Sequence, residues 1–371
     1  MPQAAEGKIN AEVLAWRVGK RLGEWVEDIK EYVQGRHHKT YLVILRSGVV
    51  RLVRVHCPVS RKLGSGVTPA TKMQSEIATM KHVLKCTRVP VPEVFVYDAD
   101  ADGGVGGEWM VMEYVQGVPL DECWVQMTAD ERASVVAGII AVLAELVSLR
   151  FPAIGSLQED EQGLCVVGPM TFTPSRNVHD LAAPDPASCG PYRNYLAWLE
   201  SLAMRRMSFD SGLELDPFQK ANVDINLARI KGTSILIPSG MQELCGIALE
   251  HPEFTLDNIL VDPYDPGRIK AVIDWEGART VPLWAIQPRP FRNLDLVDHW
   301  VSNEDKRKLQ EAVWKGVGCR APMWQLATGS ERVPHELRMM YYRAWRSTMV
   351  FSPIDFHYWD RAMRGETAVN V

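Results

Sequence analysis

Cysteine motifs and an excess of basic charge are both missing from this 371-residue sequence. None of its seven cysteines belongs to a Cys-x-x-Cys pair, so the cysteines support neither a zinc site nor a disulfide framework. A reducing compartment is the default for such a chain, and we therefore expect a cytoplasmic location. The formal net charge of −5 provides no basic surface for nucleic acid, so no nucleic-acid partner is expected.

Long apolar runs are missing too. The first residues lack a basic segment followed by an apolar run, so no signal peptide is expected. The most apolar stretch, residues 135–147, is too short to cross a bilayer and contains Glu145. It predicts a buried helix, and no membrane partner is expected. The length and the hydrophobic content of 46% suit two domains or one two-lobed enzyme.

A glycine-rich phosphate-binding loop that leads from a strand into a helix is missing as well. Residues 103–107 read Gly-Gly-Val-Gly-Gly, but they lead into a strand-like run and no Lys-Ser/Thr pair follows. They predict a plain hairpin loop.

One dense polar motif is present, around two short apolar runs. Residues 258–262 and 269–274 are rich in β-branched side chains, and the linker between them holds two prolines and a glycine. This pattern predicts a β-hairpin. With the turn centred near residue 266, Asn258 lies opposite Asp274 and both side chains point to one face. Mg²⁺ usually takes one or two oxygen ligands from protein, so we expect these two residues to bind it.

A short loop, His251-Pro252-Glu253, precedes this hairpin. Loops held by rigid strands are common positions for catalytic groups. An isolated asparagine before a strand is most often a turn former, and an isolated aspartate after a strand is most often a cap. It is the joint spacing of these residues that indicates a shared site.

Apolar periodicity predicts the remaining elements. The helices that we expect cover residues 9–33, 71–86, 128–150, 191–207, 302–316 and 334–350. The strands that we expect, besides the hairpin, cover residues 41–45, 49–55, 95–97 and 109–113. Proline, glycine and serine are frequent in residues 158–190, which predicts irregular structure.

The motif resembles that of the aminoglycoside phosphotransferase family, specifically its fungal branch, which is related to choline kinases and more distantly to protein kinases. The family pattern is His-x-Asp-x-x-x-x-Asn-Ile-Leu-Val-Asp, a turn, then Val/Ile-Ile-Asp-Trp-Glu/Asp-Gly-Ala. This chain reads HPEFTLDNILVD from His251 and VIDWEGA from Val272. The resemblance also extends to residues 53–55, 72–80, 89–94, 110–120 and 151–157.

The resemblance implies a role for each matching residue of the motif. Glu253 stands where the family has its catalytic-base aspartate, and His251 is a structural member of the catalytic loop. Asn258 and Asp274 are the implied metal ligands.

For the nucleotide, the resemblance implies two charged residues and a hinge. Arg54 is the implied cation that contacts the phosphates of ATP, and Glu76 is the helical glutamate that pairs with it. Glu113, Tyr114 and Val115 form the implied hinge, whose backbone pairs with adenine.

The implied fold is α+β and two-lobed, like that of protein kinases. Its small lobe, residues 1–115, contains the amphipathic helix and antiparallel strands with one inserted helix. Its larger lobe, residues 116–371, is mainly helical and carries the catalytic β-hairpin and the acceptor site. The implied function is transfer of a phosphoryl group from ATP, or another nucleoside triphosphate, with Mg²⁺, to a hydroxyl of a small-molecule acceptor.

The alternative is a weak or inactive nucleotide-binding pseudokinase with a regulatory or binding role, and a protein kinase is a third reading. Glu253 replaces the family's aspartate, and its extra methylene moves the carboxylate by about 1 Å, a displacement that can cost about 10²-fold in rate. The phosphate-covering turn, residues 35–40, holds a single glycine. These two departures favour the alternative, whereas the retained Asn258 and Asp274 favour an enzyme.

Overall fold

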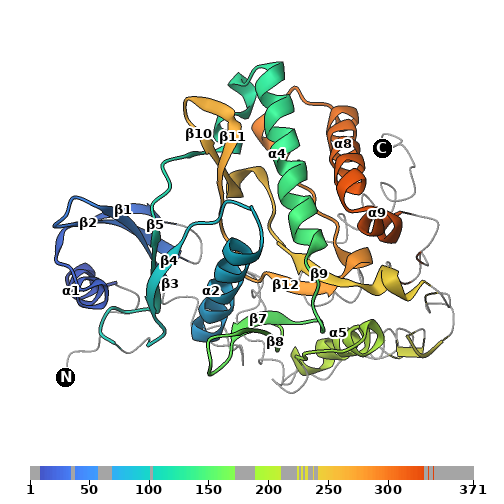
Figure 1. The fold of residues 1–371 in the computed structure, drawn as a ribbon, viewed down its shortest axis with the longest axis horizontal. Coiled ribbons are helices and arrows are strands. Elements are labelled where there is room, and N and C mark those ends of the chain that lie inside the picture. The colour runs from blue at the N-terminus through green and yellow to red at the C-terminus, as the bar shows by residue number, and fades with distance from the viewer. Residues whose placement is uncertain are drawn as a thin grey trace.

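The computed structural model shows a sheet-rich N-terminal part beside a larger, mainly helical part (Figure 1). The described residues are 9–34, 38–56, 69–100, 103–171, 189–209, 224, 227–228, 230–232, 237, 241–329, 333 and 337. The antiparallel sheet with helices agrees with the expected α+β class.

The N-terminal part is a five-stranded antiparallel sheet with the order β1-β2-β3-β5-β4. Its strands are β1 (Val26–Gln34), β2 (His38–Leu45), β3 (Val50–His56), β4 (Val94–Asp98) and β5 (Trp109–Glu113). β2 to β5 confirm the four strands predicted from the sequence. Residues 103–107 form turns before β5, as predicted for a plain loop.

The two faces of this sheet pack against different partners, because side chains alternate along a strand. Trp109 and Val111 of β5 pack with Leu14 and Val18 of α1 (Ala11–Leu22). The intervening methionines of β5, at positions 110 and 112, join the large core that continues into the C-terminal part. The sheet therefore connects α1 on one side to the larger part on the other.

The predicted helix over residues 9–33 is wrong in its second half. α1 ends at Leu22 because Gly23 adopts a left-handed conformation (φ 71°) and caps the helix, a common glycine stop. The chain then forms β1 from Val26. β1 contains irregularities in its pairing with β2, and these interrupt the alternation that would have marked a strand.

The helix α2 (Pro69–Cys86) confirms the helix expected at 71–86. It lies between the sheet and the hairpin of β7 (Ser156–Glu159) and β8 (Cys165–Gly168) in the larger part (Figure 1). β7 and β8 correct the prediction of irregular structure over 158–190. They are short strands around a tight turn, so they lack the length that a periodicity signal needs.

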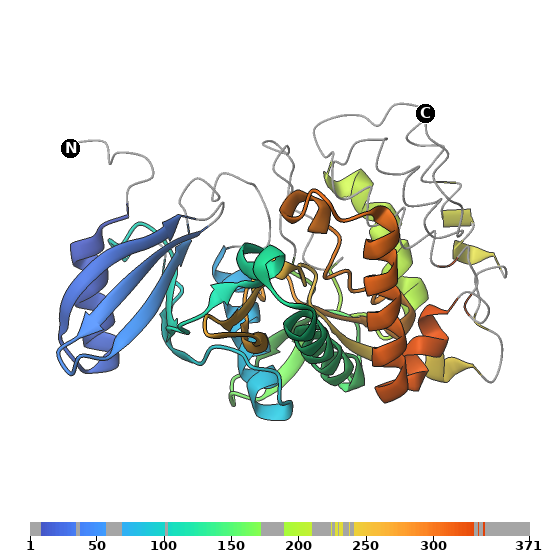
Figure 2. The same ribbon diagram turned by 90° about the horizontal axis from the view of Figure 1, so that it is seen from above.

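The larger part is organised around α4 (Ala129–Ser148), which Figure 2 shows almost end-on. α4 packs against β11 and α8, and Val135, Ile139, Leu143 and Leu146 are buried in the core. A capping box between Thr128 and Glu131 sets where it begins. The buried helix predicted from the apolar stretch is therefore confirmed.

Further elements complete the larger part. The helices are α3 (Leu120–Cys123), α5 (Tyr195–Phe209), α7 (Leu294–Val297), α8 (Asn303–Arg320) and α9 (Pro322–Thr328). The strands are β6 (Val118–Pro119), β9 (Ile247–Glu250), β10 (Ile259–Asp262), β11 (Asp265–Val272) and β12 (Arg279–Pro282). α5 and α8 confirm the helices expected at 191–207 and 302–316. The helix expected at 334–350 falls outside the described residues, apart from Leu337, as do residues 35–37 of the phosphate-covering turn.

The β10–β11 hairpin is extended by β6 into a three-stranded sheet with the order β11-β10-β6. Gly117, just before β6, allows this approach, because a Cβ there would lie 3.0 Å from the Cβ of Leu260. β6 follows β5 along the chain, so this pairing brings the predicted hinge beside the predicted catalytic hairpin.

Candidate active site

Arg54 and Glu76 form a buried ion pair between β3 and α2. Their side chains are only 11% and 1% exposed. Arg54 lies within β3, opposite Thr40 of β2 and Met110 of β5, so the sheet holds its backbone on both sides. Burial raises the pKa of the Glu76 carboxyl above its ordinary value, and the neighbouring guanidinium opposes that shift. The pairing expected from the sequence is present.

Arg54 also reaches the end of the hairpin. Its Nη1 lies 3.7 Å from Oδ1 of Asp274. Asp274 follows β11, and its side chain is 44% exposed while that of Arg54 is nearly covered. The guanidinium of Arg54 therefore lies between buried Glu76 and the more exposed Asp274, at the junction of the two parts of the fold.

The hairpin register differs by one residue from the prediction. Ile259 pairs with Val272, and the backbone N–H of Ile273 donates to the carbonyl of Asn258 at 3.0 Å. Asn258 is therefore opposite Ile273, and the expected pairing with Asp274 is wrong. The physical reason lies in the turn, where two irregularities in the pairing shift the strands relative to the centre assumed from the prolines.

Asp274 leaves the strand alternation altogether. Its φ of 61° is the only positive value of a non-glycine residue in the described part of the chain. Backbone in this region is tolerated by aspartate and is concentrated at functional sites. The left-handed conformation turns the side chain away from the direction a regular strand would give it, and the carboxylate lies near Arg54 instead.

Acidic groups surround Asp274. Its pKa is raised, first by burial and then by the nearby carboxylates of Glu276, Glu253 and Asp257, while Arg54 lowers it. Repelling carboxylates that share a site favour a bound cation. The donor set of carboxylate and amide oxygens fits Mg²⁺.

Asn258 is held by the catalytic loop. Its side-chain Nδ2 donates to the backbone carbonyl of Glu253 at 2.9 Å. This bond uses the nitrogen of the amide, so its oxygen is the atom that a cation would meet. Asn258 ends a short 3₁₀ turn, residues 256–258, immediately before β10.

The Glu253 carboxylate has a partner that sequence reasoning missed. Nη2 of Arg292 lies 2.5 Å from Oε2 of Glu253, with side chains 45% and 51% exposed. Arg292 comes from the loop before α7, far from the motif in sequence, and no local pattern marks it. The carboxylate expected to be the base is thus oriented by a guanidinium.

His251 anchors the loop to the hairpin. Its Nε2 lies 3.1 Å from the carbonyl of Ile273, so this nitrogen carries the proton and donates. The ring packs edge-on against Trp275, with ring centroids 4.7 Å apart. Burial lowers the pKa of His251 to about 4, so the ring is neutral at pH 7. These contacts suit a structural residue, which is the role that the resemblance implied.

The hinge begins at Glu113, the last residue of β5. The backbone N–H of Glu113 donates to the carbonyl of Glu93 at 2.8 Å. The ring of Tyr114 packs edge-to-face on Tyr32 of β1, with ring centroids 5.7 Å apart. Val115 is half-buried between β5 and β6. β1 therefore covers the hinge from the sheet side.

A second buried polar cluster lies close to Asp274. Glu276 forms an ion pair with Lys72 of α2, and its other oxygen, Oε2, lies 3.1 Å from Nε2 of His38. His38 in turn lies 3.3 Å from Nε2 of His56. Burial lowers the pKa of His38 well below its ordinary value. The sequence motif contains Glu276, but its partners come from β2, β3 and α2.

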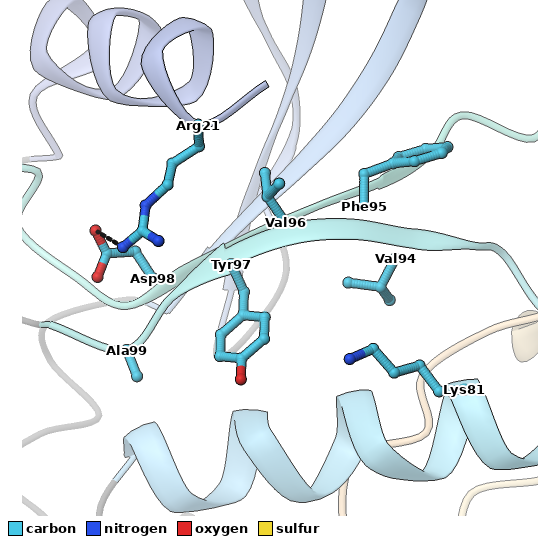
Figure 3. Close-up of a pocket in the computed structure, with 8 residues that line it drawn as sticks. All are labelled: Arg21, Lys81, Val94, Phe95, Val96, Tyr97, Asp98 and Ala99. Carbon is cyan, nitrogen blue, oxygen red and sulfur yellow. Dashed lines mark ion pairs between the residues drawn. The ribbon is translucent and has the colours of Figure 1, made fainter. Parts of the chain in front are cut away.

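A shallow hollow of about 370 Å³ lies away from this site (Figure 3). The edge strand β4 lines it together with Arg21 and Lys81. Arg21 pairs with Asp98, and Lys81 pairs with Glu159. None of the predicted site residues lines it, and its charged groups already have partners, so it does not change the assignment.

Within the described residues, no helix is long and apolar enough to cross a membrane.

Comparison with known sequences places the chain among phosphotransferases. The model of the phosphotransferase enzyme family matches residues 28–219, just over half of the chain. The matched span includes Arg54, Glu76 and the hinge, and it ends before the hairpin.

Two fungal relatives match over different lengths. A subtelomeric hrmA-associated cluster protein of Aspergillus fumigatus is 25% identical over 311 residues, which cover 70% of this chain and 59% of the relative. Altered inheritance of mitochondria protein 9, mitochondrial, of Meyerozyma guilliermondii is 27% identical over 155 residues, which cover 41% of this chain and 25% of the relative. The chain thus spans about three fifths of the first relative's length.

A solved structure shows the same fold. The streptomycin–ATP ternary complex of APH(2″)-IIa superposes with a TM-score of 0.52 at 13% identity, covering 93% of this chain and 92% of that one. The two-lobed protein-kinase-like fold expected from the sequence is therefore confirmed.

Proposed function

This chain belongs to the phosphotransferase enzyme family, and we propose that it transfers a phosphoryl group from ATP, with Mg²⁺, to a hydroxyl of a small molecule. The observation that carries this proposal is the position of Arg54, which pairs with Glu76 and lies 3.7 Å from Asp274. Phosphoryl transfer asks the protein mainly for positioning and charge neutralisation. A rigidly held cation beside a carboxylate of a metal site provides both.

In this proposal Arg54 contacts the α- and β-phosphates of ATP. Glu76 keeps the guanidinium in place, because separating the two buried side chains would leave a buried charge without its partner. The backbone of Glu113, Tyr114 and Val115 binds the adenine. The solved relative of the same fold holds ATP, which supports a nucleotide in this position.

Asp274 and Asn258 are the proposed ligands of Mg²⁺. The fit rests on the repelling carboxylates around Asp274 and on the orientation of the Asn258 amide. When bound, Mg²⁺ neutralises charge on the phosphate oxygens. His251, through its bond to the carbonyl of Ile273, fixes the loop against the residue that precedes Asp274.

Glu253 is the proposed base, which accepts or orients the proton of the acceptor hydroxyl. Arg292 acts on Glu253 as a positioning residue by holding Oε2, so the other carboxylate oxygen is the one directed to the acceptor. An arginine that fixes the longer side chain offsets the freedom that the extra methylene adds.

The alternative function is nucleotide binding without turnover. The Glu253–Arg292 ion pair favours binding without turnover, because a carboxylate that is paired with a guanidinium is a weaker proton acceptor for a substrate hydroxyl. The two functions share the nucleotide and metal sites and differ only in the acceptor step.

An ATP-consumption screen over amino alcohols, sugars and aminoglycosides tests the proposal, with Asp274→Asn as the blank. Aminoglycosides belong in the panel because the solved relative binds streptomycin. Acceptor-dependent consumption that Asp274→Asn abolishes supports the enzyme. A thermal shift with ATP and Mg²⁺ but no consumption supports binding alone, and the absence of both contradicts the nucleotide site.

Two further predictions belong to this proposal. We propose lobes at residues 1–115 and 116–371, supported by the end of β5 at Glu113 and the start of β6 at Val118. We also propose a cytoplasmic location, with mitochondria as the alternative because one group of relatives is named mitochondrial. Cell fractionation of the tagged chain distinguishes the two compartments.

A further inference from the structure

We propose that His38, His56 and Glu276 form a binding site for Zn²⁺, separate from the Mg²⁺ site. The three side chains are contributed by β2, by β3 and by the segment after β11. One ligand atom from each lies within 4.8 Å of the other two. The inference does not depend on phosphoryl transfer.

The fold brings the two histidines together directly. His38 and His56 are opposed partners in the register of β2 and β3, so their side chains share a face of the sheet. Their rings lie 4.3 Å apart between centroids and are tilted by 59°. Their Nε2 atoms are 3.3 Å apart. Both rings therefore direct the same nitrogen to one point.

The spacing of the ligand atoms matches a zinc coordination shell. Zinc binds imidazole nitrogen at about 2.0–2.1 Å and carboxylate oxygen at about 2.0–2.2 Å in tetrahedral geometry, which separates neighbouring ligand atoms by about 3.3–3.5 Å. Two of the three edges are 3.3 Å, from His38 to His56, and 3.1 Å, from His38 to Oε2 of Glu276, and the third, from His56 to Glu276, is no longer than 4.8 Å. An ion could enter with small adjustments of the side chains.

The types of ligand atom in this site favour zinc over magnesium. Two imidazoles and a carboxylate suit zinc and other transition metals, whereas Mg²⁺ prefers oxygen ligands. His56 and Glu276 are buried, and the side chain of His38 is 13% exposed. Three protein ligands leave a fourth position for water or another group.

Lys72 does not exclude the ion. It pairs with Oε1 of Glu276, whereas His38 contacts Oε2. In the absence of the metal, the lysine balances the buried carboxylate. With the metal, Oε2 is the ligand and Lys72 can keep Oε1, so the two cations need not compete for one atom.

The position of the site indicates its consequence. It connects β2 and β3 of the small sheet to the segment that contains Asp274, two residues before Glu276. A bound ion would therefore tie the two parts of the fold together beside the candidate active site.

The test uses the full chain without a polyhistidine tag, treated with EDTA and dialysed. Excess Zn²⁺ is then added back, and bound Zn²⁺ is measured by elemental analysis after gel filtration. Co²⁺, added to a second metal-free sample, serves as a spectroscopic probe. We expect one Zn²⁺ per chain and intense visible bands of tetrahedral Co²⁺. Excess Mg²⁺ should displace neither ion.

Variants separate this site from other histidines. His38→Gln and His56→Gln should each weaken Zn²⁺ binding by more than about 100-fold, the upper end for loss of a residue that only supports a ligand. His299→Gln is the matched control, since His299 is exposed and distant in sequence. Lys72→Met should bind Zn²⁺ at least as tightly as the unmodified chain.

Two results would overturn the inference. One is a wild-type chain that retains no stoichiometric Zn²⁺ and shows no tetrahedral Co²⁺ spectrum. The other is a pair of folded histidine variants that bind Zn²⁺ like the control. Because the wild-type spectrum and the Lys72→Met variant do not depend on the histidine variants, poor folding of the latter leaves the inference testable.

Discussion

The guanidinium of Arg54 lies 3.7 Å from the carboxylate of Asp274 across the junction of the two parts of the fold. Arg54 is fixed by a central strand and by buried Glu76, whereas Asp274 is held in a left-handed conformation at the end of β11. The sheet and the buried ion pair restrain Arg54, and the fold sets the backbone conformation of Asp274. The distance between them is therefore a property of the fold.

Removing the charge of Arg54 should destabilise the folded chain. Arg54→Met leaves Glu76 buried without its partner, which costs about 3–5 kcal/mol of unfolding free energy in comparable buried pairs. Urea unfolding measures this loss of unfolding free energy. The double variant Arg54→Met, Glu76→Leu should recover much of the stability but not ATP binding. Arg307→Met, which breaks only exposed pairs on α8, should cost less than about 1 kcal/mol.

Removing the proposed metal ligand should affect activity and spare the fold. Asparagine tolerates the left-handed conformation of Asp274, and Asp274→Asn removes one of several repelling carboxylates. We expect the melting temperature to stay or rise and Mg²⁺-dependent turnover to fall by about 10²-fold or more. Asp265→Asn, at the exposed start of β11, is the control. Unchanged turnover in Asp274→Asn would show that the metal assignment is wrong.

Releasing Glu253 should separate catalysis from stability. Arg292→Gln breaks an ion pair that is about half exposed, so unfolding free energy should change by less than about 1 kcal/mol. If Arg292 positions the base, kcat falls while the KM for ATP stays the same. Arg268→Gln, an exposed arginine in the hairpin, should change neither. A fall in stability with kcat intact contradicts the positioning role.

Shortening Glu253 tests the base directly. Glu253→Asp should preserve or raise turnover if the carboxylate occupies the base position, because aspartate and glutamate have similar unperturbed pKa values. The measurement is acceptor-dependent ATP consumption at saturating ATP. Complete loss of turnover would show instead that the reach of the glutamate to Arg292 is required.

His251 should make stability depend on pH. Its pKa is lowered to about 4 in the folded chain, below the ordinary value of 6.5, so the unfolded state binds more protons between these values. Stability from this group is complete above about pH 6.5 and is lost as the pH falls toward 4, by about 3 kcal/mol in total.

The pH dependence is read from urea unfolding at pH values between 4 and 7. His251→Asn should remove the destabilisation that His251 contributes as the pH falls, so this variant should lose less stability between pH 6.5 and 4 than the unmodified chain. His299→Asn, at an exposed position, should leave the pH dependence unchanged. Equal slopes for His251→Asn and the unmodified chain would contradict a buried neutral ring.

Local patterns identified most of the elements and failed where an element was short or irregular. α2 and α4 are long helices whose apolar residues recur with helical spacing, so the sequence pattern predicts them. β1 was assigned to a helix because its apolar residues are spaced three and four apart and the pairing irregularities hide the alternation. The glycine at position 23 was the signal that could have ended the helix correctly.

The site shows the same division. Spacing alone predicted that Asn258 and Asp274 lie opposite each other in the hairpin, and the register corrects this, because the register and the left-handed conformation of Asp274 depend on the turn. Arg292 and Lys72 were not assigned roles, because their partners lie on other elements.

The sequence by itself determined the family, the α+β class and the residues of the motif, because motif and periodicity are local properties of the chain. The resemblance implied the pairing of Arg54 with Glu76, but only the tertiary structure decided the other charge pairings of the site. Arg54 meets Asp274, Arg292 meets Glu253, and His38 and His56 meet Glu276 through contacts between distant segments. Coulomb energies and ligand geometry depend on distances of a few ångströms, and those distances exist only after the chain has folded.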